Sequence, residues 1–520
     1  MENTIYSLVP PLLAIIMVIA TRRVLLSLGA GIIAAGFILG EFHVGKSLNF
    51  IWQSIKDIFV ADGELNTWNV FILIFLLLLG IITAFINISG GSRAFGDWAM
   101  KRVKTRAGAQ VLAAILGIII FIDDYFNALA VGQVSRPITD RQRVSRAKLA
   151  YIIDSTSAPV CVVSPISSWG AYIIGLIGTI LTAHGVKEYS AFSAFLRIIP
   201  MNLYVWSALA LVFIVAVKGF DFGSMKKHED HAMRTGEVFD PTKTAPGELK
   251  EELPVSEKGT VGDLIWPIVG LVFGTVAAML WTGAQAAEGS ATLFNIFENT
   301  DVSKSLVYGG LIGLAVAVIL FFRQSAMLKA IDGKVFFTGV WEGIKSMLPA
   351  VYILIFAWAI VSLIDQLQTG AFLAEIVQQS NLNVSLLPFI LFVVAGIMAF
   401  STGTSWGSFG ILLPIAGDIT ASTDISMILP AMAAVLAGSV FGDHCSPISD
   451  TTILSSTGAG SNHIDHVMTQ LPYALTAAAI AAVGYIIIGF TGSTILALGT
   501  VLVLLIIFVF TVGKLSKKTA

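Results

Sequence analysis

The sequence predicts an all-α polytopic membrane protein with two inverted repeats, re-entrant helical hairpins, broken transmembrane helices and about eleven crossings. Composition gives the first observation: 56% of the 520 residues are hydrophobic, 12% are charged, and the mean hydropathy is +0.85. A soluble domain of this length would expose large apolar patches. The other two observations are the placement of basic residues and a duplicated motif. A net charge of −2 excludes the basic field that nucleic-acid binding needs.

Eleven apolar segments approach the roughly 20 helical residues that a bilayer crossing needs. They are 5–21, 24–40, 67–88, 149–183, 196–217, 262–283, 305–322, 346–365, 425–456, 467–490 and 494–513. The segments 149–183 and 425–456 are too long for one straight helix and carry a polar interruption around proline, so we expect each to be a broken helix. The first segment lacks the flanks of a cleaved signal peptide and is expected to be retained.

Lys and Arg clusters between the apolar segments fix the expected orientation in the cell membrane. Placing every cluster in the cytoplasm leaves the N-terminus outside and the C-terminus inside. On this basis the arginines between Arg136 and Arg146 are a topology anchor rather than a substrate funnel. The stretch 220–260 is polar, shows no helical periodicity and is expected to be a mobile cytoplasmic linker.

Two segments do not fit as crossings. Residues of about 108–135 begin and end among cytoplasmic charges, and each limb is only about 15 residues long, which predicts a re-entrant hairpin. Residues of about 386–417 predict a second hairpin that enters from outside. The chain then divides into a first inverted repeat (1–219), the linker (220–260), a second inverted repeat (261–490) and an additional C-terminal helix with a basic tail (491–520).

The sequence Ser-Pro-Ile-Ser follows each predicted hairpin, at 164–167 and again at 446–449. Asp123 at the first tip precedes Ser164 by 41 residues, and Thr402 at the second tip precedes Ser446 by 44. Because the two hairpins enter from opposite sides, the repeats are inverted, which is a plan typical of secondary transporters.

Acidic residues at membrane depth are costly unless they are paired, hydrated or neutralised. The candidates for ion and proton coupling are Asp123, Asp124, Asp154, Asp443, His444 and Asp450. A carboxylate can hold sodium when ionised and a proton when neutral, and that competition is the minimum an antiporter requires. The alternatives are that the tip acids cap helices, that Asp450 caps the helix after the break, and that His444 is a structural hydrogen-bonding group.

Hydroxyl and amide groups near the tips and breaks are candidate neutral ligands. They are Asn127, Ser157, Ser164, Ser167, Ser401, Thr402, Thr404, Ser405, Ser446, Ser449 and Thr451. Their alternative role is to satisfy backbone groups freed in broken helices. For sodium itself we expect Asp123, Asp443, Ser164 and Ser446, and we expect no cofactor. His463, Asp465 and His466 are expected at the cytoplasmic end, in a solvated loop rather than as a pH sensor.

The run from Gly442 to Thr452, GDHCSPISDTT, together with Phe121-Ile122-Asp123-Asp124-Tyr125 and the earlier Ser-Pro-Ile-Ser, closely resembles the NhaC-type sodium/proton antiporter family. The likeness covers most of the chain outside 220–260. It implies membership of the ion transporter superfamily, in which a transport domain with two hairpins moves like an elevator against a scaffold. The hairpins with 149–183 and 425–456 would move, and the other helices would form a scaffold that dimerises.

The resemblance leaves the substrate open, because relatives exchange carboxylates or take up amino acids with the same ion gradients. The sequence therefore predicts sodium/proton exchange first and coupled transport of a small amino or organic acid second. A channel is disfavoured by the paired inverted hairpins. An enzyme is disfavoured because no nucleophile with a positioned base stands out. The expected partners are sodium, protons, lipid and a second copy of the chain.

Overall fold

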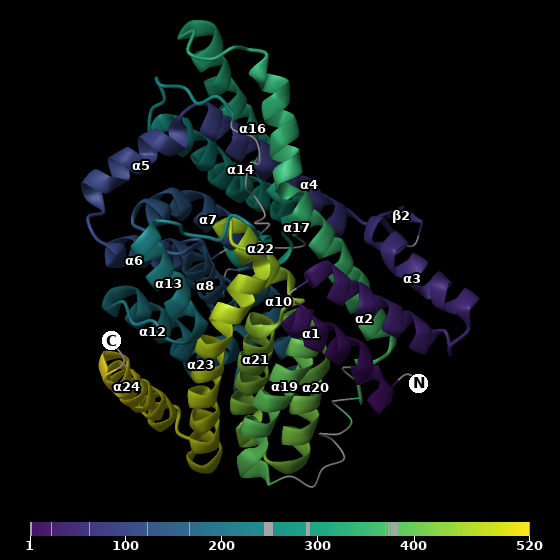
Figure 1. Ribbon diagram of the computed structural model, residues 1–520. Helices are drawn as coiled ribbons and strands as arrows, with labels where there is room; N and C mark the ends of the chain where they lie inside the picture. Colours follow the sequence, from purple (N-terminus) through teal and green to yellow (C-terminus); the bar gives the residue numbers. More distant parts are fainter. Residues whose placement is uncertain are drawn as a thin grey trace.

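The structure is a computed structural model that describes residues 3–518 except 22, 62, 122, 166, 244–252, 288–291, 370, 373–374 and 376–382. Helices make up nearly all of it (Figure 1), and the strands described are two-residue β1 (Val60–Ala61) and β2 (Glu64–Leu65), paired antiparallel. The all-helical prediction is thus confirmed.

Nine helices in the described part of the chain are long and apolar enough to cross a membrane. Eight coincide with crossings expected from the sequence. The ninth, Val384–Thr402, is the first limb of the second predicted hairpin and has 19 residues. These helices make the chain an integral membrane protein.

One set of helices, which we call the α4 group, packs around the long helices α4 and α17. It consists of α1 (Val9–Thr21), α2 (Val24–Leu39), α3 (Val44–Phe59), α4 (Thr67–Ile88), α5 (Gly91–Arg102), α14 (Gly262–Ala286), α15 (Leu293–Glu298), α16 (Val302–Phe322) and α17 (Val335–Gln366). These helices occupy the upper and right-hand parts of Figure 1.

The remaining helices, which we call the hairpin group, pack mainly on one another. They are α6 (Arg106–Ile119), α7 (Asp124–Arg141), α8 (Arg146–Thr156), α9 (Ala158–Cys161), α10 (Ser168–Ala183), α11 (Ala191–Ile198), α12 (Leu203–Lys218), α13 (Gly223–Thr235), α19 (Leu387–Thr402), α20 (Ser405–Thr423), α21 (Ile428–Cys445), α22 (Asp450–Ala459), α23 (His463–Thr491) and α24 (Thr494–Lys518). The two groups touch chiefly where α17 meets α22 and where α5 meets α7.

Each predicted hairpin is a pair of helices with a short turn. Asp123 ends the first turn as the N-cap of α7, where its Oδ1 accepts the Phe126 N–H at 3.0 Å. Gly403 makes the second turn in the left-handed region, with φ +71°. The same glycine packs on Ile448, which a Cβ would approach to 2.9 Å, so the second tip touches the second break.

The two Ser-Pro-Ile-Ser motifs lie where helices are interrupted, and the last serine of each caps the helix that follows. Ser167 accepts the Gly170 N–H at 2.8 Å, and Ser449 accepts the Thr452 N–H at 3.4 Å. The first interruption begins earlier than the motif, at Ser157, because Pro159 opens the four-residue helix α9. Ile166 lies outside the described residues.

Part of the predicted mobile linker is an ordered helix, which corrects the expectation for 223–235. α13 buries Met225, Glu229 and Ala232, at a spacing that places them on one helical face. Glu229 accepts hydrogen bonds from Arg106 at 2.6 Å, Lys148 at 3.2 Å and the Ser145 N–H at 2.7 Å. Hydrophobic periodicity does not reveal this face, because α13 is rich in charged residues and one of the buried positions is a glutamate.

Candidate functional site

A cavity of about 430 Å³ lies where both hairpin tips and the second break meet α4 and α17. The residues that line it are Trp68, Asn69, Asp123, Asp124, Tyr125, Ala357, Trp358, Val361, Gly403, Thr404, Trp406, Ile448 and Asp450. The cavity therefore has walls from both helix groups.

Two acids of the first tip reach this cavity. Asp123 and Asp124 are 3% and 4% exposed. One oxygen of Asp124, Oδ1, accepts the indole N–H of Trp169 at 2.9 Å, whereas its Oδ2 is buried without a hydrogen-bond partner among the residues that the structure describes. Since a buried carboxylate oxygen without a donor is costly, it marks a position for a cation or a proton.

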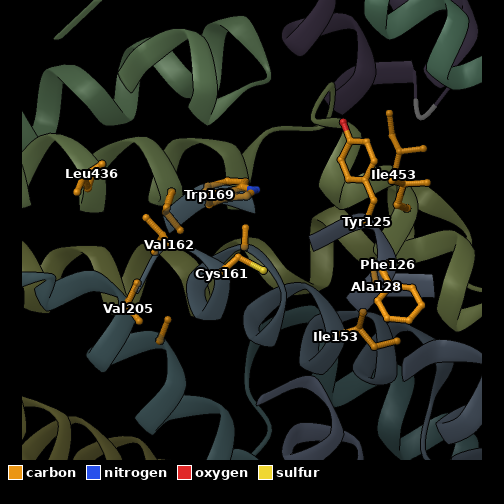
Figure 2. Packing of buried hydrophobic residues seen from close by; sticks show 14 of the residues in the cluster. Tyr125, Phe126, Ala128, Ile153, Cys161, Val162, Trp169, Val205, Leu436 and Ile453 are labelled. Carbon is orange, nitrogen blue, oxygen red and sulfur yellow. The ribbon is translucent and has the colours of Figure 1, made fainter. Parts of the chain in front are cut away.

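Asp450 reaches the cavity from the start of α22. Its Oδ2 accepts a hydrogen bond from the Tyr125 hydroxyl, and its Oδ1 accepts the Thr451 N–H at 2.8 Å. Tyr125 thus ties the first hairpin tip to the second break. Figure 2 shows the Tyr125 ring among buried side chains that include Ile453, with its hydroxyl at the far end from Phe126.

The helices α7 and α22 lie against each other in register. Gly132 stands eight residues after Asp124, and Gly458 stands eight residues after Asp450. A Cβ on Gly132 would lie 2.4 Å from the backbone of Gly458, so the helices touch backbone to backbone. Both N-termini therefore open on the cavity side by side, and their dipoles partly offset the negative charge of the acids.

The carboxyl groups described in the lining of the cavity have no basic side chain beside them in that lining. Three carboxyl groups line it, and among its described lining residues none is lysine, arginine or histidine. Within the part of the chain that the structure describes, no three His, Cys, Asp or Glu side chains are close enough to hold a metal ion together. A sodium ion here would therefore need neutral oxygens or water as further ligands.

Asp443 forms a separate centre inside the hairpin group. Its two carboxylate oxygens accept the hydroxyls of Ser405 at 2.8 Å and Ser449 at 2.5 Å. Asp443 is 1% exposed and does not line the cavity. This carboxylate connects the start of α20 to the second break.

Asp154 and His444 lie in a third polar cluster. Asp154 accepts hydrogen bonds from Ser455 at 3.2 Å and Gln470 at 2.6 Å, and lies 3.1 Å from the His466 Nε2. Gln470 also donates to the backbone carbonyl of His444 at 2.5 Å.

The His444 ring contacts the Tyr204 hydroxyl at 2.6 Å and the Ser155 hydroxyl at 3.0 Å. The expectation of a solvated loop for His463 and His466 is wrong, because both are buried, at 2% and 0% exposed. Both lie near the start of α23, where the His463 Nε2 lies 2.9 Å from the Pro447 carbonyl of the second break and His466 faces Asp154 of α8.

Most of the predicted neutral ligands bond to backbone. Ser164 donates to the Val160 carbonyl at 2.7 Å and Ser446 to the Phe400 carbonyl at 2.8 Å. The others of this kind are Asn127 on Gly117, Ile120 and Thr156; Ser157 on Asp124; Ser167 on Cys161 and Ser164; and Thr402 on Met398. Ser401 is buried near the end of α19, and Thr451 contacts the Ser449 hydroxyl at 2.8 Å. Thr404 lines the cavity.

Of the four residues expected to hold sodium, Asp123 lines the cavity, whereas Asp443, Ser164 and Ser446 are not among its described lining residues. Sequence reasoning missed the aromatic partners of the acids, Tyr125 and Trp169, and the cavity walls Trp68 and Trp358. Tyr125 directly follows the two tip acids, and Trp169 lies two residues after Ser167. The position of a tyrosine or tryptophan close to a predicted tip or break could have indicated these partners.

The sequence of this chain matches one protein family and several known proteins. The model of the Na+/H+ antiporter family matches residues 160–490, which include both Ser-Pro-Ile-Ser motifs and the second hairpin. The chain belongs to the Na+/H+ antiporter family. The NhaC-type resemblance of the sequence is thereby confirmed.

Proteins similar in sequence to this chain carry names that describe different functions. A protein of Haemophilus influenzae, described as uncharacterized, is 47% identical over 518 residues, 99% of this chain and 96% of its own. A malate-2H+/Na+-lactate antiporter of Bacillus subtilis is 27% identical over 38% of this chain and 40% of its own. The arginine/ornithine antiporter ArcD of Halobacterium salinarum is 28% identical over 50% and 46%. The chain is a secondary transporter of this family.

Proposed function

We propose that this protein exchanges sodium for protons across the cell membrane by alternating access. The observation that carries the proposal is the convergence of Asp123, Asp124 and Asp450 on one cavity whose described lining holds no positive side chain. Three carboxyl groups in one buried site cannot all remain ionised without a counter-charge. Sodium or protons supply that charge in turn, and their competition couples the two fluxes.

The placement of the cavity supports a moving hairpin group. Its acids belong to the hairpin group, whereas Trp68 and Trp358 belong to the α4 group. If the hairpin group slides along the α4 group, the acids move past Trp68 and Trp358 from one side of the membrane towards the other. We propose an elevator motion of inverted repeats with the α4 group as a dimerising scaffold, the N-terminus outside and the C-terminus in the cytoplasm, on the basis of the family resemblance and the basic clusters.

In this proposal Asp443 stabilises the site without lining the cavity. The serines bonded to it lie next to Thr404 and Asp450, so its hydrogen bonds hold the second tip on the second break. Asp154 and His444 are placed to transmit a protonation change to α23, because His466 and Gln470 contact them directly. The ions themselves are proposed to bind in the cavity.

A second candidate is coupled transport of a small amino or organic acid. A volume of about 430 Å³ falls in the range of pockets for small organic ligands, and the rings of Trp68, Trp358 and Trp406 give it apolar walls. The names of two relatives, for malate and lactate and for arginine and ornithine, agree with such substrates. In that case sodium would occupy part of the cavity beside the solute.

The deciding experiment uses purified protein in liposomes that contain a pH-sensitive dye. An imposed sodium gradient should move protons with no organic solute present, and liposomes without protein give the leak. Proton movement only after addition of malate, lactate, arginine or ornithine would favour the second candidate. Absence of any sodium-dependent flux under either condition would contradict both.

A further inference from the structure

A second cavity, of about 400 Å³, lies at the opposite end of the contact between the two helix groups. We call it the inner cavity. Its walls come from α4, α5 and α14 of the α4 group, and from α7 and the segment 236–238 of the hairpin group. Asn69 and Asn87 mark the two cavities along α4, 18 residues apart, which is about 27 Å along a helix.

The inner cavity is lined mainly by basic side chains, whereas the cavity of Asp123, Asp124 and Asp450 is lined by acidic ones. Arg93, Arg136 and Arg141 line it, together with one acid, Asp140. The Asp140 carboxylate is bound by Arg146, with an Nη2 to Oδ2 distance of 3.2 Å. Arg141 pairs with Asp97 at 3.2 Å, but both side chains are largely exposed, so that pair is weak. Counted by side chain, the described lining holds three arginines and one aspartate, which is a formal surplus of positive charge.

The preference for basic residues on the cytoplasmic side explains why arginines are frequent here. It does not explain why arginines of both helix groups line one cavity. Arg93 lies in the first turn of α5, where its Nη2 donates to the Ser256 carbonyl at 3.0 Å, whereas Arg136 and Arg141 lie at the end of α7, on the other helix group. Ser92, in the first turn of α5, also lines the cavity, whereas Gly91 packs on the backbone of α14. Ser92 donates to the Asn87 Oδ1 at 2.5 Å, which leaves the Asn87 amide nitrogen as that side chain's donor group.

Guanidinium groups from two directions, an amide donor and a helix N-terminus form a set of donors suited to an anion. Arginine binds carboxylate and phosphate groups through paired N–H donors, and a helix N-terminus favours negative charge. Leu264 and Ile268 of α14 add an apolar wall beside these donors, as an acyl chain or an organic acid would need.

We propose that the inner cavity binds an anion that carries a phosphate or carboxylate group, either the headgroup of an anionic phospholipid or a soluble acid. The anion would bridge Arg93 of the α4 group and Arg136 of the hairpin group. Binding then stabilises the present arrangement of the two groups and slows their relative motion. The proposal does not depend on which ion or solute the other cavity transports.

The test measures thermal unfolding of the delipidated full-length protein in neutral detergent during titration with inorganic phosphate. Chloride at matched ionic strength is the reference. A second arm compares nanodiscs of phosphatidylcholine alone with nanodiscs that also contain phosphatidylglycerol. Arg93→Gln and Arg136→Gln are the test variants, and Arg102→Gln removes the same charge elsewhere on α5.

Saturable stabilisation by phosphate, about tenfold weaker in Arg93→Gln and in Arg136→Gln but unchanged in Arg102→Gln, supports a site for soluble anions. Stabilisation by phosphatidylglycerol alone, with the same variant pattern, supports a lipid headgroup. If Arg136→Gln does not fold, the exposed Arg93 gives the comparison. Equal stabilisation of the wild type and all variants, or none beyond the chloride and phosphatidylcholine references, overturns the proposal.

Discussion

The indole N–H of Trp169 donates to the Asp124 Oδ1 across 2.9 Å, and this bond joins α10 to the first hairpin tip. Both residues are buried, and the other Asp124 oxygen has no hydrogen-bond donor in the described part of the chain. Trp169 also packs edge-on against Trp406, with ring centroids 5.8 Å apart. The tryptophan therefore orients the carboxylate and holds the second tip at the same time.

Trp169→Phe should weaken sodium binding while most of the aromatic packing remains. Removing a donor to a charged group costs about 1.5 to 3 kcal/mol, so the half-saturating sodium concentration should rise at least about tenfold. Sodium-dependent proton flux in liposomes measures it. Trp266→Phe, on the exposed face of α14, is the control, and an unchanged sodium dependence in Trp169→Phe would argue against an oriented carboxylate.

Gly403→Ala should impair transport because the second tip has no room for a side chain. Its φ of +71° is unfavourable for alanine by about 1 to 2 kcal/mol, and the new Cβ would press on Ile448. Maximal flux should fall about tenfold. Gly407→Ala is the matched control, since the nearest atom to its Cβ is 3.6 Å away. Equal flux in both variants would show that the tip tolerates displacement.

Glu229→Gln should loosen the cytoplasmic end of the hairpin group. Among the described residues, the fully buried Lys148 would then keep Asp221, at 2.7 Å, as its one charged partner. Breaking a buried pair costs about 3 to 5 kcal/mol, so thermal unfolding in detergent should begin at a clearly lower temperature. Glu237→Gln removes an exposed acid whose partner is His231 and should leave unfolding unchanged. Similar curves for both variants would refute the buried network.

Docking of α13 should weaken in acid. Burial lowers the pKa of His228 below its ordinary 6.5, against the opposing charges of Asp465 and Glu229 and with the help of Lys243 and His231. A lowered pKa means that the undocked helix binds the proton more tightly, so the stabilisation is complete above about pH 6.5 and is lost as the pH falls.

Hydrogen exchange of α13, corrected for intrinsic rates, should therefore be faster near pH 5.5 than near pH 7.5. His228→Gln should abolish that difference, with α21 as an internal reference in each sample. Slower exchange in acid, or the same difference in the variant, would contradict the sign of the effect.

The sequence predicts the helical hairpins, the interruptions and the acids because each has a local signature. Pro and Ser interrupt an apolar run, Gly403 permits a left-handed turn, and Asp123 caps a helix. These features depend on neighbours in the chain, so a pattern argument finds them. The same reasoning places Asp450 near a site, although it leaves open whether the residue serves as a cap.

Pairings between distant segments could not be predicted in this way. Tyr125 and Asp450 are 325 residues apart, and only the packing of Gly132 on Gly458 brings their helices into register. Asp443 and Asp123 share a residue type and a position near a break, yet a serine pair encloses Asp443 while Asp123 lines the cavity. Burial of His466 depends on Asp154 of a different helix, and no periodicity within 463–491 reveals that partner.

The central claim is that the acids of the cavity, rather than acids elsewhere in the protein, carry sodium and protons. Its most direct test is sodium-driven proton flux in liposomes by Asp123→Asn, Asp124→Asn and Asp450→Asn, with Asp418→Asn as the exposed control on α20. The account predicts near-complete loss of flux in each cavity variant, with folded protein in the membrane and normal flux in the control. Near-normal flux in all three cavity variants would contradict it.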